Sequence, residues 1–118
     1  MHEFSICQSL VHAVQSELEK LNPAPARLLK VGVAVGKLRQ IIPEHLQFAY
    51  ETLTRETSLE GSSLEVRSVP LTGQCEHCGW KGEMTDTFFE CRECTSSKGM
   101  LLGGMELYLD NLEIEEAQ

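Results

Sequence analysis

Two pairs of cysteines constrain this 118-residue chain more than any other feature of its sequence. The first pair is Cys75 and Cys78, and the second is Cys91 and Cys94. Two residues lie within each pair, and twelve residues lie between the pairs. Two intervening residues let one tight turn present two thiolates to one ion, and two such turns complete a tetrahedron. Gly79 follows the first pair, as expected where such a turn requires a positive φ angle. The spacing predicts a zinc site in a small rubredoxin- or ribbon-like module.

The same four cysteines have other interpretations. They could be free thiols, two disulfides or a redox motif, and iron in a rubredoxin-like site uses the same ligand pattern. The N-terminus lacks a basic region followed by an apolar stretch, so we expect a cytoplasmic location, where disulfides are rare. Redox motifs seldom occur as facing pairs. Because four thiolates leave no open coordination position, the predicted zinc is structural and not catalytic.

The rest of the sequence predicts two helices and three main strands. Apolar residues recur at helical spacing from Ser5, a candidate N-cap, to Leu21, and Pro43 suits the first position of a second helix. Cys7 lies within the first helical pattern, which predicts a buried small hydrophobic residue and not a reactive thiol. His77 is expected to be an exposed loop side chain. The main strands are predicted at residues 28–36, 64–71 and 105–115.

The predicted fold class is α+β, with a small three-stranded β-sheet covered by two helices and an inserted four-cysteine zinc-binding module. Strands 64–71 and 105–115 flank the cysteines and are expected to pair with each other. A bulge is expected near Asn111, where the apolar alternation slips, and a short strand at 87–90. The expected domain boundaries are 1–73 with 104–118 for the α+β domain, and 74–103 for the zinc module.

Charge and composition argue against several functional classes. The chain has 10 basic and 18 acidic residues, a net charge of −8, which disfavours contact with nucleic-acid phosphates. No run of 18 or more apolar residues is present, so no membrane span is expected. No nucleophile–base signature or phosphate-binding loop occurs, which predicts a protein without catalytic residues. An acidic zinc-ribbon module for protein–protein or nucleic-acid interactions is the alternative function.

The N-terminus offers nitrogen ligands close together. Methionine before a bulky residue is usually retained, which would leave the α-amine on Met1, and the His2 imidazole can chelate together with its own peptide nitrogen. Planar, nitrogen-rich ligand sets of this kind suit Ni²⁺ or Cu²⁺. On chemistry alone, a solvated terminal histidine is the simpler interpretation.

Segments along nearly the whole chain carry a resemblance to a known family. They are Met1-His2-Glu3-Phe4-Ser5, residues 33–36, residues 43–51, residues 60–65, both cysteine pairs and Gly104-Met105-Glu106-Leu107. In these segments the chain resembles the HypA/HybF family of hydrogenase nickel-incorporation proteins. It departs from the family pattern at Arg92, where proline is frequent, and at residues 37–40, and neither departure touches a proposed metal ligand.

The resemblance implies a metallochaperone that passes Ni(II), its cargo, toward the active site of [NiFe]-hydrogenase. Its implied partners are a HypB-like GTPase and the hydrogenase large-subunit precursor, and some relatives also serve urease, which extends the implied partners to urease maturation proteins. By position, His2 would anchor nickel beside the Met1 amine and Glu3, and the four cysteines would hold structural Zn(II). Glu44 and His45 are further candidate donors. The expected state is a monomer or homodimer, and a hinge at Gly103-Gly104 would permit domain swapping.

Overall fold

The structure, a computed structural model, describes residues 2–85 and 88–117. The chain divides into two compact units. The first comprises Met1–Ala34, Ile41–Arg67 and Tyr108–Gln118, and the second comprises Val35–Gln40 and Ser68–Leu107. Each unit contains one three-stranded sheet, and both helices belong to the first, so the fold class is α+β as predicted. Among the described residues, no helix has the length and apolar character needed to cross a membrane.

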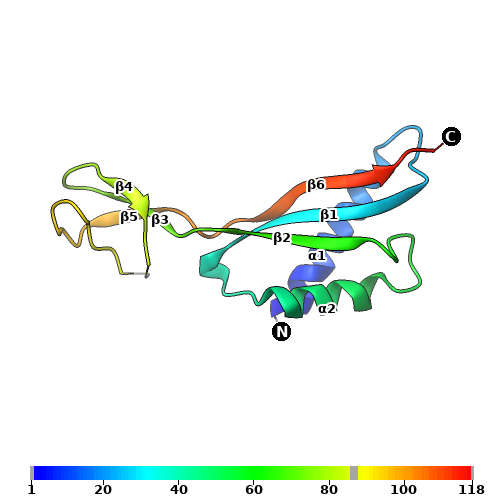
Figure 1. Ribbon diagram of the computed structural model, residues 1–118, viewed down its shortest axis with the longest axis horizontal. Helices are drawn as coiled ribbons and strands as arrows, with labels where there is room; N and C mark the ends of the chain where they lie inside the picture. The colour runs from blue at the N-terminus through cyan, green and yellow to red at the C-terminus, as the bar shows by residue number, and fades with distance from the viewer. Residues whose placement is uncertain (1, 86–87, 118) are drawn as a thin grey trace. The chain divides into compact units, whose positions relative to one another are not determined.

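The first unit is built around its most apolar strand. It contains α1 (His2–Glu19), α2 (Pro43–Thr54) and most of β1 (Arg27–Gly36), β2 (Ser63–Val69) and β6 (Leu107–Glu115). The strand order is β2-β1-β6, so β1 is central (Figure 1). The prediction that 64–71 and 105–115 pair with each other is therefore wrong. Residues 31–36 are all buried, and a strand that buries both faces belongs at the centre of a sheet, whereas its more polar neighbours occupy the edges.

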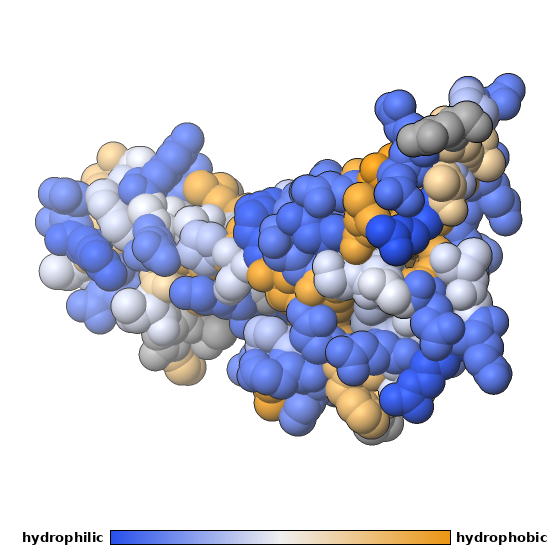
Figure 2. All heavy atoms as spheres, turned by 45° about the vertical axis from the view of Figure 1, so that its right-hand side comes forward, coloured by the Kyte–Doolittle hydropathy of each residue, from blue (hydrophilic) through white to orange (hydrophobic). Residues whose placement is uncertain are grey.

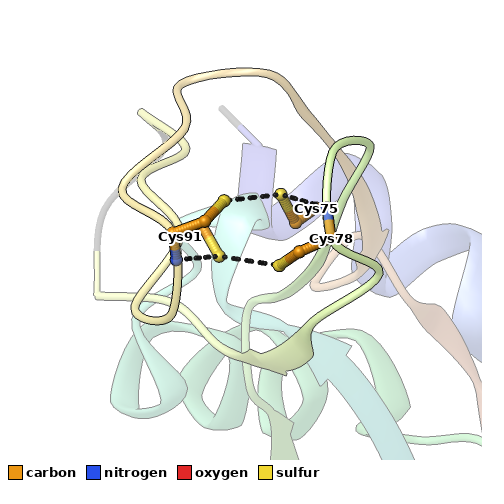
Figure 3. Close-up of side chains that lie close together, drawn as sticks. Cys75, Cys78 and Cys91 are labelled. Atoms are coloured by element: carbon orange, nitrogen blue, oxygen red, sulfur yellow. Dashed lines mark hydrogen bonds between the residues drawn. The ribbon is translucent and has the colours of Figure 1, made fainter.

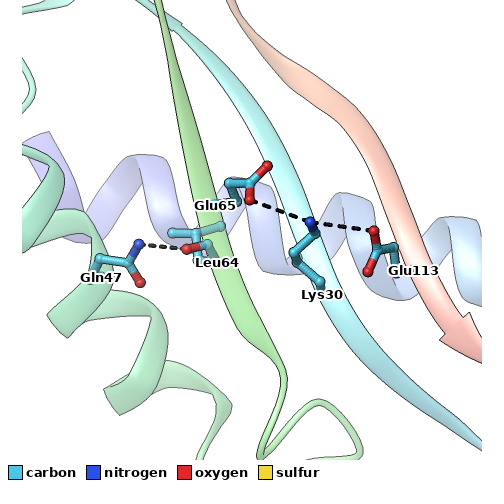
Figure 4. Close-up of polar contacts among 5 residues, drawn as sticks. All are labelled: Lys30, Gln47, Leu64, Glu65 and Glu113. Atoms are coloured by element: carbon cyan, nitrogen blue, oxygen red, sulfur yellow. Dashed lines mark hydrogen bonds and ion pairs between the residues drawn. The ribbon is translucent and has the colours of Figure 1, made fainter.

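The two helices supply the rest of the core. Both helices pack against each other, and α1 crosses one face of the sheet (Figures 1 and 4). The buried apolar residues of this unit include Cys7, Leu10, Val14, Val31, Val33, Leu46, Ala49, Tyr50 and Leu59. Cys7 is fully buried, as predicted. Two hydrogen bonds also hold α2 in place. The Tyr50 hydroxyl lies 2.6 Å from the Ser62 hydroxyl, and the Gln47 side-chain amide donates to the Leu64 carbonyl.

Helix α1 begins earlier than predicted. It starts at His2, so Ser5 lies inside the helix and is not its N-cap. Glu3 stands in the first turn, where its charge interacts favourably with the helix dipole. Helix α2 does begin at Pro43, because a proline at the first helical position lacks only an N–H that would be unpaired there. The consequence for the N-terminus is that His2 belongs to a helical turn and not to an extended tail.

The face of the sheet that carries Lys30 bears a row of charged side chains. Lys30 Nζ lies 3.3 Å from Glu65 Oε2 on β2 and 3.3 Å from Glu113 Oε1 on β6 (Figure 4). Arg67 on β2 forms a forked pair with Asp110 on β6, at 2.8 and 2.9 Å. Asp110 and Glu113 thus share one face although they are three positions apart, and strict alternation would place them on opposite faces. This offset confirms the irregularity predicted near Asn111.

The second unit contains a sheet that the sequence analysis missed. Its elements are η1 (Lys37–Arg39), β3 (Thr72–Cys75), β4 (Lys81–Glu83) and β5 (Gly99–Gly103), with strand order β4-β3-β5 and antiparallel pairing. The strand predicted at 87–90 is absent from its described part, residues 88–90, and Thr87 lies outside the described residues. Phe89 instead packs its ring against Trp80, with centroids 6.4 Å apart.

Close backbone contact holds η1 in the second unit. Gly36 N–H donates to the Glu106 carbonyl at 2.8 Å, and Leu38 N–H to the Gly104 carbonyl at 2.7 Å. Arg39 Nε adds a bond to the Met105 carbonyl at 2.9 Å. A Cβ at Gly36 would lie only 2.1 Å from the Gly104 oxygen, so the two backbone segments approach too closely here for any larger residue.

Candidate metal centre

The two cysteine pairs form matching turns. Cys75 ends β3, and in the first turn its N–H donates to the Trp80 carbonyl at 2.7 Å while Gly79 N–H donates back to the Cys75 carbonyl at 3.2 Å. The second turn repeats both bonds at 3.0 Å, from Cys91 to Ser96 and from Thr95 to Cys91. The same backbone conformation thus holds each pair.

Thr95 occupies the position that Gly79 has in the first turn. Both residues have positive φ angles, 82° for Gly79 and 62° for Thr95. A β-branched residue rarely adopts this conformation, because its Cβ crowds the neighbouring carbonyl. The role of Thr95 was not predicted from the sequence, although alignment of the two cysteine pairs places Thr95 opposite Gly79.

The sulfur atoms face one another and accept backbone hydrogen bonds. Cys75 Sγ accepts from the N–H groups of His77 and Cys78 at 3.3 and 3.4 Å, and Cys91 Sγ accepts from those of Glu93 and Cys94 at the same two distances. Figure 3 shows the Cys75, Cys78 and Cys91 side chains converging from opposing loops. These donors compensate negative charge on sulfur, so the turns are suited to thiolates and not to neutral thiols.

The spacing of the sulfur atoms fits a tetrahedral metal ion. Cys75 Sγ lies 3.6 Å from Cys94 Sγ, Cys78 Sγ lies 3.5 Å from Cys91 Sγ, and all four lie within 4.8 Å of one another. Four zinc–sulfur bonds of about 2.3 Å at tetrahedral angles place the sulfurs about 3.8 Å apart. The four cysteines, free of disulfides, therefore form a metal-binding cluster.

The thiols of the cluster differ in the direction in which their pKa values shift. Desolvation raises the pKa of Cys75, but the N–H groups of Cys78 and His77 outweigh it and lower that pKa to about 6. At Cys94 the Ser96 N–H lowers the pKa, but burial and the other three thiols prevail and raise it to about 12. Four thiolates this close repel one another, so complete ionisation requires a bound cation.

The four cysteines of the cluster differ in exposure, and His77 is not one of the clustered ligands. Cys75 and Cys91 are almost fully buried, Cys94 is half-buried and Cys78 is exposed. His77 is exposed, as expected, and is not among the clustered ligands. Within residues 2–85 and 88–117, these four cysteines are the only group of three or more His, Cys, Asp or Glu side chains close enough to share an ion.

The predicted nickel ligands that the structure describes lie in the first turns of two different helices. His2 is the first residue of α1, Glu3 is half-buried in the same turn, and Met1 lies outside the described residues. Glu44 and His45 are exposed in the first turn of α2. Nickel binding at His2 therefore stays a prediction.

Fold and site together define a class: a small α+β protein that carries a four-thiolate metal centre on paired turns in a separate unit. A family model described as "Hydrogenase/urease nickel incorporation, metallochaperone, hypA" matches residues 1–114. The chain belongs to this HypA family. Among curated relatives, the hydrogenase maturation factor HypA of Nostoc punctiforme is 36% identical over 98% of this chain and 97% of its own length. That of Desulfatibacillum aliphaticivorans is 30% identical over 100% and 90%.

Solved structures agree on the fold. The solution structure of the Ni metallochaperone HypA from Helicobacter pylori superposes with a TM-score of 0.67 at 20% identity and covers 98% of both chains. A second solution structure of a HypA protein gives a TM-score of 0.71 at 22% identity, over 97% of this chain and 96% of the other. At these identities the similarity supports the shared fold.

Proposed function

We propose that this chain binds Ni(II) at its N-terminus and delivers it for the maturation of [NiFe]-hydrogenase, while the four cysteines hold a structural Zn(II). The observation that carries the proposal is the match to a nickel-incorporation family over residues 1–114. The closed sulfur centre supports it, because four thiolates leave no open position for a transferable ion. A cargo metal then needs a second site.

The start of α1 is suited to that second site. The first N–H groups of a helix have no intrahelical acceptor, so peptide nitrogens near His2 can bind nickel without breaking a helical hydrogen bond. The His2 imidazole, the Met1 amine and the Glu3 region together offer the nitrogen-rich set that Ni²⁺ favours. Release requires protonation or displacement of His2, so nickel affinity falls as the pH drops toward about 6.5.

The zinc site has a different role in this proposal. With Zn(II) bound, the two cysteine turns are fixed to each other, and β3, β4 and β5 extend from them. We assign nickel binding to residues 1–73 with 104–118 and zinc binding to 74–103. Zinc supplies folding free energy to a module with little apolar core of its own.

The family also suggests the partners. A HypB-like GTPase and the hydrogenase large-subunit precursor are the proposed ones, with urease maturation proteins as a further candidate, and the cytoplasm is the proposed location. The chain acts as a carrier and not as an enzyme. Much of the surface seen in Figure 2 is hydrophilic, and with a net charge of −8 the partners are proteins and not nucleic acids.

The test uses zinc-loaded protein with its native N-terminus. Nickel affinity is measured by titration calorimetry, and zinc content by elemental analysis, for the wild type, His2→Ala and His12→Ala. His12 is an exposed histidine on the same helix, so His12→Ala is the matched control. We expect His2→Ala to lose nickel binding while zinc stays at one per chain. Unchanged nickel affinity in His2→Ala would refute the assignment, and His45→Ala tests the further donor.

A further inference from the structure

A cavity in the second unit has features of a ligand site. Its volume is about 570 Å³, within the range of small-ligand pockets. The lining comes from four separate segments: η1 with Gln40, the residue before β3, the end of β4 with the loop after it, and the second cysteine turn. The two places where the sequence departs from the family pattern, Arg92 and residues 37–40, thus meet in one cavity. Neither the zinc cluster nor the proposed nickel ligands line it.

Two cations at the cavity have no partner among the residues that the structure describes. Lys37 and Arg92 are exposed, and neither side chain makes an ion pair or hydrogen bond with any residue in the described ranges. Among the described residues, the side chains of Arg55, Lys81 and Lys98 are also unpaired, but Lys37 and Arg92 line one cavity together. In a chain of net charge −8, two unpaired cations in one cavity mark it as a site for an anionic group.

The rest of the lining is apolar or hydrogen-bonding. Leu71 is buried, and Leu38 and Met84 are half-buried, so an aliphatic surface lies beside the cations. Gln40 and Thr85 add an amide and a hydroxyl. A ligand that carries both a carboxylate and an aliphatic group would satisfy both parts of the cavity.

Glu83 also lines the cavity, and its carboxylate disfavours any ligand that offers negative charge alone. It can accept a hydrogen bond from a peptide N–H, which a ligand made only of phosphates lacks. A peptide segment brings carboxylates, amide donors and apolar side chains together. This combination favours an acidic peptide over a nucleic acid.

The cavity is held in shape before any ligand arrives. Gln40 has a φ of 54° and its N–H donates to the Lys37 carbonyl, while the bonds from Leu38 and Arg39 to residues 104–105 fix η1. Met84 N–H donates to the Leu71 carbonyl at 2.7 Å, which fixes the opposite wall. Binding then loses little conformational entropy on the protein side.

We propose that this cavity is a docking site for an acidic, leucine-bearing peptide segment of a partner protein, with its carboxylates at Lys37 and Arg92 and its aliphatic side chain on Leu38, Leu71 and Met84. The inference goes beyond the proposed nickel delivery and does not depend on it.

The probe is a capped four-residue peptide, Leu-Glu-Leu-Glu, titrated into ¹⁵N-labelled, zinc-loaded full-length protein without nickel. We expect saturable amide shifts centred on Leu38, Gln40, Thr85 and Arg92, with a Kd at or below about 5 mM. The neutral peptide Leu-Gln-Leu-Gln should bind at least about fivefold more weakly, and added salt should weaken the acidic peptide.

The charge dependence is tested with matched variants. Lys37→Gln with Arg92→Gln should weaken binding of the acidic peptide about fivefold to tenfold. Lys81→Gln with Lys98→Gln removes the same charge from exposed positions outside the cavity and should leave the affinity within about twofold. Zinc content and spectral dispersion verify that each variant is folded. Equal losses in both variants, equal binding of the neutral peptide, absence of saturable shifts, or stronger binding of inorganic phosphate at the same amides would overturn the proposal.

Discussion

Replacing Gly36 by alanine tests whether backbone contact at η1 stabilises the second unit. Gly36 has φ −71° and ψ 143°, which alanine adopts without strain. At such a position the substitution normally stabilises a protein by about 0.4–1 kcal/mol, because it restricts the unfolded chain. Here the added Cβ would lie 2.1 Å from the Gly104 oxygen and 2.6 Å from the Met105 nitrogen. Backbone atoms cannot rotate away, so the segment must move.

The size of the effect follows from what that movement breaks. The bonds from Gly36 N–H to Glu106 and from Leu38 N–H to Gly104 contribute about 1 kcal/mol each. Overpacking adds about 1–3 kcal/mol. After the entropic gain is subtracted, we expect a net loss of about 2–4 kcal/mol in the free energy of unfolding.

Tryptophan fluorescence is the appropriate assay, since the chain's one tryptophan, Trp80, lies in the second unit with Gly36. Denaturant unfolding of the zinc-loaded protein is followed at this residue for the second unit and by circular dichroism for the first unit, which contains Gly32 and both helices. Gly32→Ala on the same strand is the control, because its Cβ would meet the exposed Asn111 side chain at 2.9 Å, which can rotate away at a cost below about 1 kcal/mol. A Gly36→Ala protein as stable as the wild type would refute the argument.

Three further predictions address the metal centre and the core. Thr95→Gly should stabilise the zinc-loaded protein by about 1 kcal/mol, since it removes a strained positive φ, whereas Gly79→Ala should destabilise it; denaturant titration compares them. Leu46→Ala, at a fully buried position, should cost about 2–5 kcal/mol in helix unfolding measured by circular dichroism, without loss of zinc by elemental analysis. Burial raises the pKa of Cys7 to about 11, so a thiol reagent near neutral pH should find no fast-reacting thiol with zinc bound, four after chelation and five after denaturation. The raised pKa means that folding favours the neutral Cys7 thiol. The contribution of Cys7 to the free energy of unfolding is therefore complete below pH 9.0 and is lost as the pH rises toward about 11.

The cysteine cluster could be predicted from sequence because its geometry is local. Two intervening residues fix each turn, and only the facing of the two turns depends on the rest of the fold. The helix from Pro43 and the central segment 28–36 were predictable for the same reason, since proline position and an apolar run act within a few residues.

Features set by tertiary contact were not predictable in this way. The order β2-β1-β6 depends on which strand is covered on both faces, and chain order suggested the wrong pairing. The sheet of the second unit was missed because β4 has three residues, Lys81–Glu83, and β5 begins and ends with glycine, so neither shows an alternating pattern. Thr95 was missed because threonine does not signal a positive φ.

The offset between Asp110 and Glu113 makes strand β6 dependent on its exact number of residues. The inserted position lets Asp110 reach Arg67 and lets Glu113 reach Lys30, while Leu112 and Ile114 remain half-buried. Inserting one more residue after Asn111 would turn Glu113 toward the core and Leu112 and Ile114 toward water, because alternation moves all three side chains together. Natural variation in this strand should therefore tolerate exchanges of residue type more readily than insertions.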